Sequence, residues 1–471
     1  MNWLTTLLQQ VINRRVSTFS IFGATATASA KSNSLAPAII PRDQHNISRK
    51  LISSGTLKVI ARLRAAGFQA YLVGGGVRDL LLGGHPKDFD VATDAHPEQV
   101  RELFRGSRII GRRFKIVHVR LGGETIEVTT FRSNHNASAD ETETAPNPQH
   151  SARNEDGMLL RDNVYGTIAE DAARRDFTVN ALYYTTENFA VHDFTGGMKD
   201  LENRLIRIIG DPATRYREDP VRMLRAARFA AKLDFAIEPN TAKPLRELAH
   251  LLGNVPAARM FDEVLKLFMA GYGAATYRQM SEHGLFAPLF PATAAAIDVG
   301  QSAAEMLIMQ ALHNTDQRIA EHKPVTPAFI YAALLWPALQ RELHELTANG
   351  MPESVATQQA TQTTLDRQQQ LTGIPRRFSQ PMREIWELQA RLQRRDSRRA
   401  LTLLEHPRLR AAYDFLLLRE QAGEALGDIG AWWTEFMAAD EEQREHLLRQ
   451  VATPRNSGSR RRRSRKPRVE T

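Results

Sequence analysis

Hydrophobic and polar positions between residues 50 and 133 change period several times, which predicts short strands interleaved with short helices. Helical spacing, or a short apolar segment after a turn, gives the predicted helices 57–67, 77–82 and 97–104. Short apolar or alternating segments give the predicted strands 69–73, 88–93, 108–121 and 125–131. Together they predict a small unit with a mixed sheet.

Helical patterns dominate the rest of the chain. Residues 134–162 are polar and rich in Pro, Asn and Ser, which predicts a loop or a disordered insertion. One long helix is predicted over 168–184, followed by a strand pair, 189–194 and 205–210, around a turn. From residue 212 to about 450 the apolar spacing is helical and shows no fixed repeat. The predicted fold class is therefore α+β, a mixed-sheet head followed by an all-α region.

The composition is that of a globular protein, with 42% hydrophobic and 24% charged residues among 471. Cysteine is absent, which excludes disulfides and thiolate sites and fits a reducing, cytoplasmic location. The chain has no apolar segment long enough to predict a transmembrane helix. The first 42 residues contain no acid, and we interpret them as a flexible extension with one amphipathic helix. A transit peptide or a signal sequence is the alternative.

Positive charge is concentrated near the C-terminal end. Residues 455–471 hold eight basic residues and one acid, so they carry +7 of the formal charge of +9. Arginines interspersed with Ser, Gly and Pro cannot bury a core, so this tail is predicted to be disordered and to bind RNA phosphates. A merely solubilising tail is the alternative. The predicted RNA-binding residues are Arg460, Arg461, Arg462, Arg463, Arg465 and Lys466.

Two carboxylates, Asp88 and Asp90, lie one residue apart in the predicted strand 88–93. Side chains at this spacing point to the same face of a strand, where two ionised carboxylates repel each other. A divalent cation removes that conflict. Mg²⁺ prefers carboxylate oxygens together with substrate phosphates, and Mn²⁺ accepts the same hard ligands. On its own, the pair is equally typical of a solvated strand face.

A glycine turn, Gly74-Gly75-Gly76, follows the predicted strand 69–73. Without side chains, this turn would let a phosphate chain approach the backbone, and Arg78 in the next helix could donate to a phosphate. An ordinary glycine turn is the alternative. Glu127 lies in the predicted strand 125–131 and is a candidate third carboxylate; a solvent-facing glutamate would have the same pattern.

Four motifs follow one another between residues 70 and 235. They are "VGGGVRD" (73–79), "DFD" (88–90), "EDAARRDFTVNALYY" (170–184) and "REDPVRMLRAARFAAKL" (217–233). This succession resembles the nucleotidyltransferase superfamily that includes DNA polymerase beta. More narrowly, it resembles the class II tRNA nucleotidyltransferase and bacterial poly(A) polymerase family.

The resemblance implies a role for each motif. The implied catalytic residues are Asp88, Asp90, Glu127 and Asp176, and the implied metal ligands are Asp88 and Asp90. The implied nucleotide-binding residues are Gly75, Gly76, Arg78, Arg175, Asn180, Asp219 and Arg222. Within the predicted helix 168–184, Asp176 and Asn180 are four residues apart and therefore lie on one face.

The segment "IIGRRFKIVHV" (109–119) resembles a signature of the bacterial poly(A) polymerases in this family. The resemblance therefore implies template-independent addition of AMP from ATP to RNA 3′ ends, with Mg²⁺ as cofactor, Mn²⁺ as its alternative and RNA-decay proteins as further partners. The alternatives are a CCA-adding tRNA nucleotidyltransferase and a non-catalytic RNA-binding protein. Trp432 and Trp433 are predicted to pack in a core, with stacking on RNA bases as the alternative.

Five parts of the chain follow from these patterns. They are a flexible extension 1–45, a nucleotidyltransferase head 46–190 with the insertion 134–162, a nucleotide-recognition neck 191–260, a helical RNA-binding body 261–450 and a basic tail 451–471.

Overall fold

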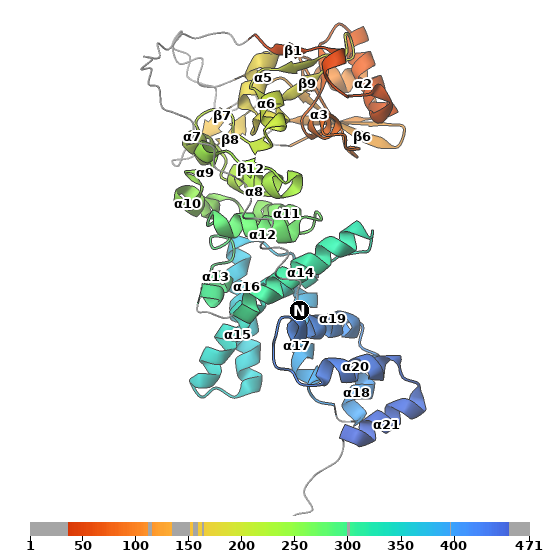
Figure 1. Cartoon of the computed structure of the whole chain (residues 1–471), viewed down its shortest axis with the longest axis vertical. Helices are drawn as coiled ribbons and strands as arrows, with labels where there is room; N and C mark the ends of the chain where they lie inside the picture. Colours follow the sequence, from red (N-terminus) through yellow and green to blue (C-terminus); the bar gives the residue numbers. More distant parts are fainter. Residues whose placement is uncertain are drawn as a thin grey trace, which may run out of the picture. The chain divides into compact units, whose positions relative to one another are not determined.

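The computed structural model describes residues 36–111, 115–133, 151–153, 159–162, 164–298, 302–395 and 397–451. The described residues from 37 onward belong to one compact unit, with which the following description is concerned. Figure 1 shows the sheet in the N-terminal part of this unit and the helices that follow it in the chain. In the part of the chain that the structure describes, no helix is long and apolar enough to span a membrane.

An eight-stranded mixed sheet forms the head, in the order β1-β10-β9-β2-β3-β6-β5-β4. Its strands are β1 (Ala38–Ile40), β2 (Ala70–Val73), β3 (Asp90–Thr93), β4 (Ser107–Ile110), β5 (Ile116–Leu121), β6 (Glu124–Thr130), β9 (Leu182–Tyr184) and β10 (Val191–Asp193). Every neighbouring pair is antiparallel except β3 and β6, which run parallel. The prediction of a mixed sheet is confirmed.

Short helices accompany the sheet. They are α2 (Ser54–Ala65), α3 (Gly75–Leu81), α4 (Pro97–Leu103), α5 (Ile168–Arg174) and α6 (Gly197–Glu202). Helix α2 begins three residues earlier than predicted because the Ser53 hydroxyl accepts the Thr56 N–H at 3.2 Å and caps its start. Its residues Val59, Ile60 and Leu63 are fully buried in the head core, as their helical spacing predicts.

Two predicted elements of the head are wrong. The single strand 108–121 is two antiparallel strands, β4 and β5, and Gly111 (φ +85°) lies between them in a conformation that favours glycine. The long helix 168–184 ends at Arg174, followed by a 3₁₀ turn, η4 (Thr178–Asn180), and then β9. Residues 177–184 are all buried, which an amphipathic helix with one solvated face cannot achieve.

The predicted pair of strands 189–194 and 205–210 is also wrong. Strand β10 pairs with β1 and β9, whereas β11 (Leu205–Ile206) pairs in parallel with β12 (Ala236–Ile237). The intervening residues form helix α6 instead of a turn, because Asp193 accepts the backbone N–H groups at the start of that helix. Within the predicted insertion, β7 (Ser151–Arg153) and β8 (Leu159–Asp162) form a short antiparallel pair.

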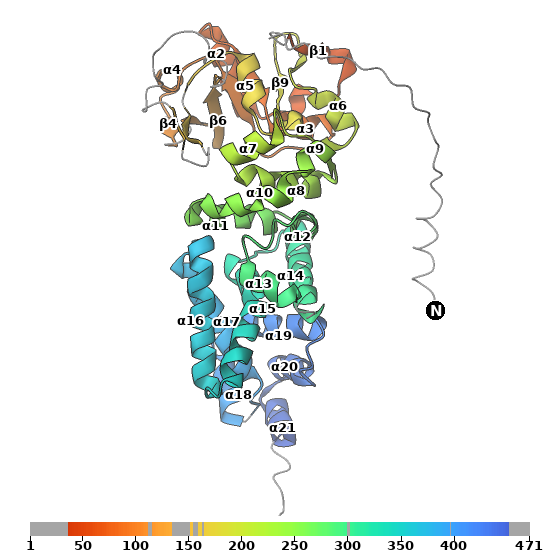
Figure 2. The ribbon, with the colours of Figure 1, turned by 90° about the vertical axis from the view of Figure 1, so that its left-hand side faces the viewer.

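The remainder is helical, as predicted, and its elements follow one another in Figure 2 from green to blue. They are α7 (Pro212–Glu218), α8 (Val221–Leu233), α9 (Pro239–Ala242), α10 (Leu245–Leu248), α11 (Ala257–Phe268), α12 (Gly273–Glu282), α13 (Pro291–Asp298), α14 (Ser302–Ala320), α15 (Pro327–Ala348), α16 (Glu353–Leu371), α17 (Arg376–Leu392), α18 (Ser397–Leu404), α19 (Leu409–Gln421), α20 (Ile429–Ala438) and α21 (Glu441–Val451). Three further 3₁₀ turns are η1 (Arg42–Gln44), η2 (Arg49–Leu51) and η5 (Ala249–Asn254).

Trp432 and Trp433 belong to a separate apolar core formed by helices α17–α21. Trp433 is fully buried, and its indole N–H donates to the carbonyl of Leu392 at 2.8 Å. Trp432 is 7% exposed. The prediction that this pair packs in a core is therefore confirmed, since neither ring presents a free face to an RNA base.

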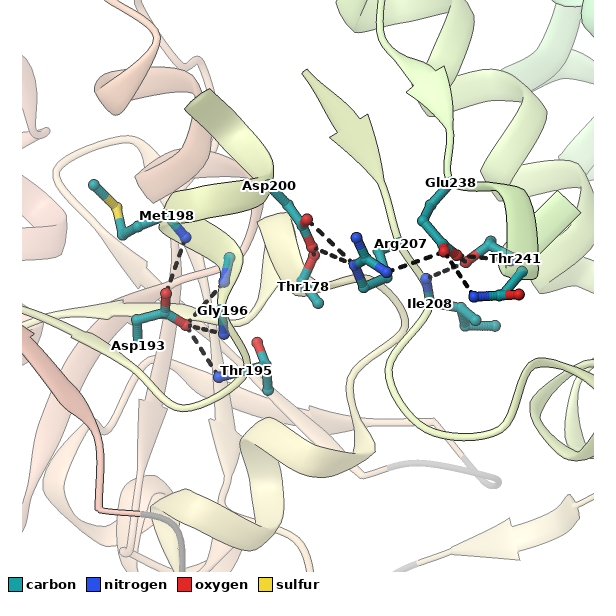
Figure 3. Close-up of polar contacts among 12 residues, drawn as sticks. Thr178, Asp193, Thr195, Gly196, Met198, Asp200, Arg207, Ile208, Glu238 and Thr241 are labelled. Atoms are coloured by element: carbon teal, nitrogen blue, oxygen red, sulfur yellow. Dashed lines mark hydrogen bonds and ion pairs between the residues drawn. The ribbon is translucent and has the colours of Figure 1, made fainter. Parts of the chain in front are cut away.

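A polar network joins the sheet-bearing part to the first helices that follow it (Figure 3). Arg207 donates through Nε to Asp200 at 3.0 Å and forms an ion pair with Glu238 at 3.1 Å. Asp200 also accepts the hydroxyl of Thr178 in η4 at 2.7 Å, while Glu238 caps α9 through the N–H of Thr241. Both carboxylates are almost fully buried, so the network fixes η4 relative to α9.

Candidate active site

The glycine turn lies directly against the aspartate pair. Asp90 opens β3 and is in register with Val73, the last residue of β2, so Gly74 comes next to it. A Cβ added at Gly74 (φ +78°) would lie 3.3 Å from Asp90 Oδ2, and one added at Gly76 would lie 3.5 Å from the Asp88 carbonyl oxygen. Asp88 precedes the strand and is exposed. The structure thus places the turn beside the Asp90 carboxylate and the backbone of Asp88.

Asp90 is held in a site that resists its ionisation. Burial, and then the Glu127 carboxylate, raise the pKa of Asp90 to about 6; Asp88 adds to this effect and Arg175 opposes it. Glu127 is opposite Asp90 in the parallel β3–β6 register. Glu127 and Asp88 are therefore electrostatic neighbours of Asp90, and a cation beside Asp90 would relieve the repulsion.

Glu127 has a partner that the sequence interpretation did not include. His118 on β5 is in register with Glu127, and its Nε2 lies 3.2 Å from Glu127 Oε1. The Glu127 side chain is 47% exposed and the His118 side chain is 30% exposed, so this is a partly solvated contact. The alternation of β5 would place His118 on a definite face, but nothing in the sequence identifies its cross-strand neighbour.

These residues fit a magnesium ion that is shared with phosphates. Among the described residues, no three His, Asp or Glu side chains gather closely enough to form an all-protein metal site. Mg²⁺ does not require one, because it is usually held by one or two carboxylates, substrate phosphates and water. The raised pKa of Asp90, to which the neighbouring carboxylates contribute after burial, suits that arrangement.

Arg78 faces the protein rather than the space over the glycine turn. Its side chain is 2% exposed, and it donates through Nε and Nη2 to Asp79 Oδ1 and through Nη1 to Asn180 Oδ1 at 2.6 Å. A Cβ at Gly75 would lie 3.4 Å from Arg78 Nη2. Arg78 therefore packs against the turn from the protein interior, and its hydrogen bonds to Asp79 and Asn180 hold it there.

Asp176 is committed to an ion pair across two segments of the chain. Arg225 on α8 donates to Asp176 Oδ2 through Nε at 2.8 Å and through Nη2, and Asn180 donates to Oδ1 at 3.2 Å. Burial raises the pKa of Asp176, but Arg225, Asn180 and the Phe177 N–H outweigh it and lower the pKa to about 2. Asp176 is therefore ionised near neutral pH, and its bonds from Arg225 join this segment to α8.

Arg175 reaches the glycine turn. Its Nη1 would lie 3.8 Å from a Cβ at Gly74, the glycine that also adjoins Asp90. Its other nitrogens contact Asp171 and the hydroxyl of Tyr183. Among the arginines that the resemblance implies to bind the nucleotide, Arg175 is the one that lies next to Gly74 together with the Asp90 carboxylate.

Asp219 and Arg222 lie at the junction of α7 and α8 and bond to different partners. Arg222 donates to Glu218 at 3.0 Å and to the Arg215 carbonyl at 2.8 Å, and Asp219 accepts from Arg259 of α11 at 2.9 Å. Arg259 lies outside every motif recognised in the sequence. Its contact with Asp219 requires α11 to return to this junction, which no local pattern predicts.

Several polar residues were therefore missed by the sequence interpretation. They are His118, Asp171, Tyr183, Arg225 and Arg259. Asp171, Tyr183 and Arg225 stand inside the four quoted motifs, and His118 stands inside the quoted segment 109–119, so these four could have been included on that ground. The predicted RNA-binding residues 460–466, and the arginines of the segment 112–114, lie outside the described residues.

Three family models match this chain. They are described as "Poly A polymerase head domain" over residues 70–207, "Probable RNA and SrmB- binding site of polymerase A" over 234–297 and "Polymerase A arginine-rich C-terminus" over 349–468. Poly(A) polymerase I of Salmonella typhimurium is 50% identical to this chain over 431 residues, which cover 91% of each chain.

More distant similarities concern CCA-adding enzymes. The one from Lactobacillus helveticus is 40% identical over 211 residues, which cover 45% of this chain and 49% of that protein. A solved structure of the Thermotoga maritima CCA-adding enzyme complexed with tRNA aligns with a TM-score of 0.53 at 18% identity, covering 89% of this chain and 91% of that one. This last similarity shows a shared fold.

Proposed function

The chain belongs to the poly(A) polymerase I family, and we propose from this premise that it adds AMP from ATP to RNA 3′ ends without a template. It is a nucleotidyltransferase. The observation that carries the proposal is 50% identity over nine-tenths of the length of such a polymerase, whereas similarity to CCA-adding enzymes at 40% identity spans less than half of the chain.

Asp88 and Asp90 would hold Mg²⁺ or Mn²⁺ through their carboxylate oxygens. When bound, the cation supplies charge that lowers the pKa of the RNA 3′-hydroxyl and offsets charge on the transferring phosphate. Ionised Asp90 is required for this role, and Arg175 favours that ionised form. Glu127 stands beside Asp90 as a further acceptor for the hydroxyl proton.

The reaction is an in-line displacement at the α-phosphorus of ATP. A bond forms from the RNA 3′ oxygen to that phosphorus, while the bond from the phosphorus to the bridging oxygen breaks and pyrophosphate leaves. The backbone of the turn Gly74–Gly76 would face the triphosphate, and Arg175 Nη1, which would lie 3.8 Å from a Cβ at Gly74, would donate to it. Asp219 and Arg222 would meet the adenine, with Arg259 and Glu218 fixing their orientation.

For Asp176, Asn180 and Arg78 we propose a role that differs from the one the resemblance implies. Each is bonded within the protein, and together with Arg225 they connect the glycine turn to α8. We propose that these residues hold the nucleotide site in shape, and that Asp176 is an anchor and not a metal ligand. This assignment makes a different prediction for substitutions, which is developed in the Discussion.

The flanking parts of the chain would bind RNA. We retain the boundaries 46–190, 191–260 and 261–450 for head, neck and body, and 451–471 for a basic tail that attracts RNA phosphates. The family model over 234–297 is described as a probable RNA- and SrmB-binding site, which supports RNA contact there and a protein partner as well. We place the reaction in the cytoplasm, where RNA is available.

An extension assay with single nucleotides tests this function. Purified protein is incubated with Mg²⁺ and either an unstructured RNA or a tRNA that lacks its CCA end, and with ATP, CTP, GTP or UTP alone. Long ladders from ATP on both RNAs are expected. Strong incorporation of CTP, confined to the tRNA, would establish the CCA-adding alternative, and no incorporation at all would support a non-catalytic RNA-binding protein.

A further inference from the structure

The guanidinium of Arg175 is hydrogen-bonded to the protein through two of its three nitrogens, Nε and Nη2. Its Nε donates to the Tyr183 hydroxyl at 2.9 Å and to Asp171 Oδ2 at 3.2 Å, and its Nη2 donates to the same Asp171 oxygen at 3.1 Å. The Tyr183 hydroxyl in turn donates to Asp171 Oδ2 at 2.6 Å. Asp171 is 6% exposed and Tyr183 is fully buried, so solvent competes little for these bonds.

These hydrogen bonds determine which nitrogen of Arg175 remains available to a ligand. With Nε and Nη2 held, Nη1 is the nitrogen that approaches Gly74, and a Cβ at that glycine would lie 3.8 Å from Nη1 and 3.3 Å from Asp90 Oδ2. The guanidinium thus presents one donor over the glycine that adjoins the catalytic carboxylate. An arginine side chain without such restraints would lose rotamer freedom each time that it met a phosphate.

The register of the sheet places Tyr183 close to the glycine turn. Strand β9 lies beside β2, and Tyr183 is in register with Val73, the residue immediately before Gly74. Its ring packs with Val73, Ala92 and Phe131 in a small apolar cluster. The ring is therefore part of the core, whereas the hydroxyl is the part that meets Arg175. Removing the hydroxyl alone separates the two contributions.

We propose that Tyr183 and Asp171 are positioning residues, which hold Arg175 so that its Nη1 meets a phosphate of the incoming ATP above Gly74. This inference rests on the proposed function, because it names the substrate group that Arg175 receives. Asp171 has a second task, since its Oδ1 accepts the backbone N–H of Arg132 at 3.2 Å. Tyr183 is therefore the more selective residue for a test.

The test is the variant Tyr183→Phe, analysed by steady-state extension of RNA with ATP. We expect the KM for ATP to rise about 3- to 10-fold, the value of one lost hydrogen bond, with the KM for RNA unchanged. Tyr184→Phe is the matched control, since Tyr184 is also buried in β9 but contacts neither Arg175 nor Asp171 in the described part of the chain. It should leave both KM values unchanged.

A double-mutant cycle then separates positioning from simple packing. In an Arg175→Gln background, Tyr183→Phe should have no further effect on the KM for ATP, because the group through which Tyr183 acts is gone. An equal effect in both backgrounds, an unchanged KM for ATP, or an equal rise in the KM for RNA would overturn the proposal. Equilibrium titration of ATP binding compares the same variants without requiring RNA extension. A protein that binds ATP but fails to extend RNA would therefore contradict the proposed function and still test the role of Tyr183.

Discussion

The ion pair of Asp176 with Arg225 separates two accounts of the site. If Asp176 is a catalytic carboxylate, as the sequence resemblance implies, Asp176→Asn should abolish turnover and leave stability unchanged. If it anchors α8, as its two bonds from Arg225 indicate, the main effect should be on stability. The informative perturbations are therefore Arg225→Met and Asp176→Asn, alone and together.

The structure sets the magnitude of the effect. The Asp176 side chain is 13% exposed and that of Arg225 is 32% exposed, so the pair is largely shielded from solvent. Lowering the pKa of Asp176 from 3.8 to about 2 corresponds to about 2 kcal/mol of stabilisation of its ionised form. Removing Arg225 also leaves a buried carboxylate without a counter-ion, and such losses cost roughly 3–5 kcal/mol. We expect Arg225→Met to lower the free energy of unfolding by about 3 kcal/mol.

The assay is urea unfolding at pH 7, followed by circular dichroism. Arg225→Met should lower the midpoint strongly, and the double variant should recover most of the loss because the uncompensated charge is gone. Arg341→Met is a control for removing a basic residue from a helix, since Arg341 forms a half-exposed pair with Glu345 and its loss should cost less than about 1 kcal/mol. If Asp176→Asn were fully stable and inactive, the anchoring role would be refuted.

Three further predictions concern the glycine turn, the charge on Asp90 and the tail. Gly74→Ala should reduce turnover, because the new Cβ would lie 3.3 Å from Asp90 Oδ2; Gly83→Ala has the same φ of +78° and no neighbour within 4 Å, so it should cost about 1 kcal/mol in unfolding free energy without affecting turnover. The pKa of Asp90 is about 6 in the folded protein and 3.8 ordinarily, so folding favours its protonated form. The free energy of unfolding of the metal-free protein should therefore fall by about 2–3 kcal/mol as pH rises from about 4 to about 6. Asp90→Asn should abolish that loss in thermal unfolding with EDTA, and an unchanged pH profile would contradict the assignment. Removal of residues 455–471, which carry +7, should weaken RNA binding and flatten its salt dependence in filter binding, with ATP binding as the unchanged control; equal RNA affinity would contradict the role of the tail.

Local chemistry in the sequence was sufficient for the mixed sheet and for the proximity of Asp90 to the glycine turn. The proximity follows from a strand, a turn, a short helix and a return strand between residues 70 and 93, whose register needs no distant contact. The helix 168–184 was wrong because the demand for burial at Phe177, Val179 and Leu182 prevailed over the helical spacing.

Partners from distant parts of the chain could not be predicted. Arg259 reaches Asp219 across forty residues, and Arg225 reaches Asp176 across forty-nine. Arg78 looked like a phosphate ligand because a guanidinium follows the glycine turn, yet tertiary packing buries it against Asp79 and Asn180. Motifs identify which residues matter, whereas the fold determines whether each one faces the ligand or the protein.

The measurement that tests the central claim most directly is the initial rate of AMP incorporation by Asp88→Asn. Asp88 is exposed and lies outside the strand, so this variant should unfold at the wild-type temperature. Loss of a metal-binding carboxylate should reduce the rate by about 10³-fold or more at saturating ATP and RNA. A normally folded Asp88→Asn protein that extends RNA within about tenfold of the wild-type rate would contradict the account.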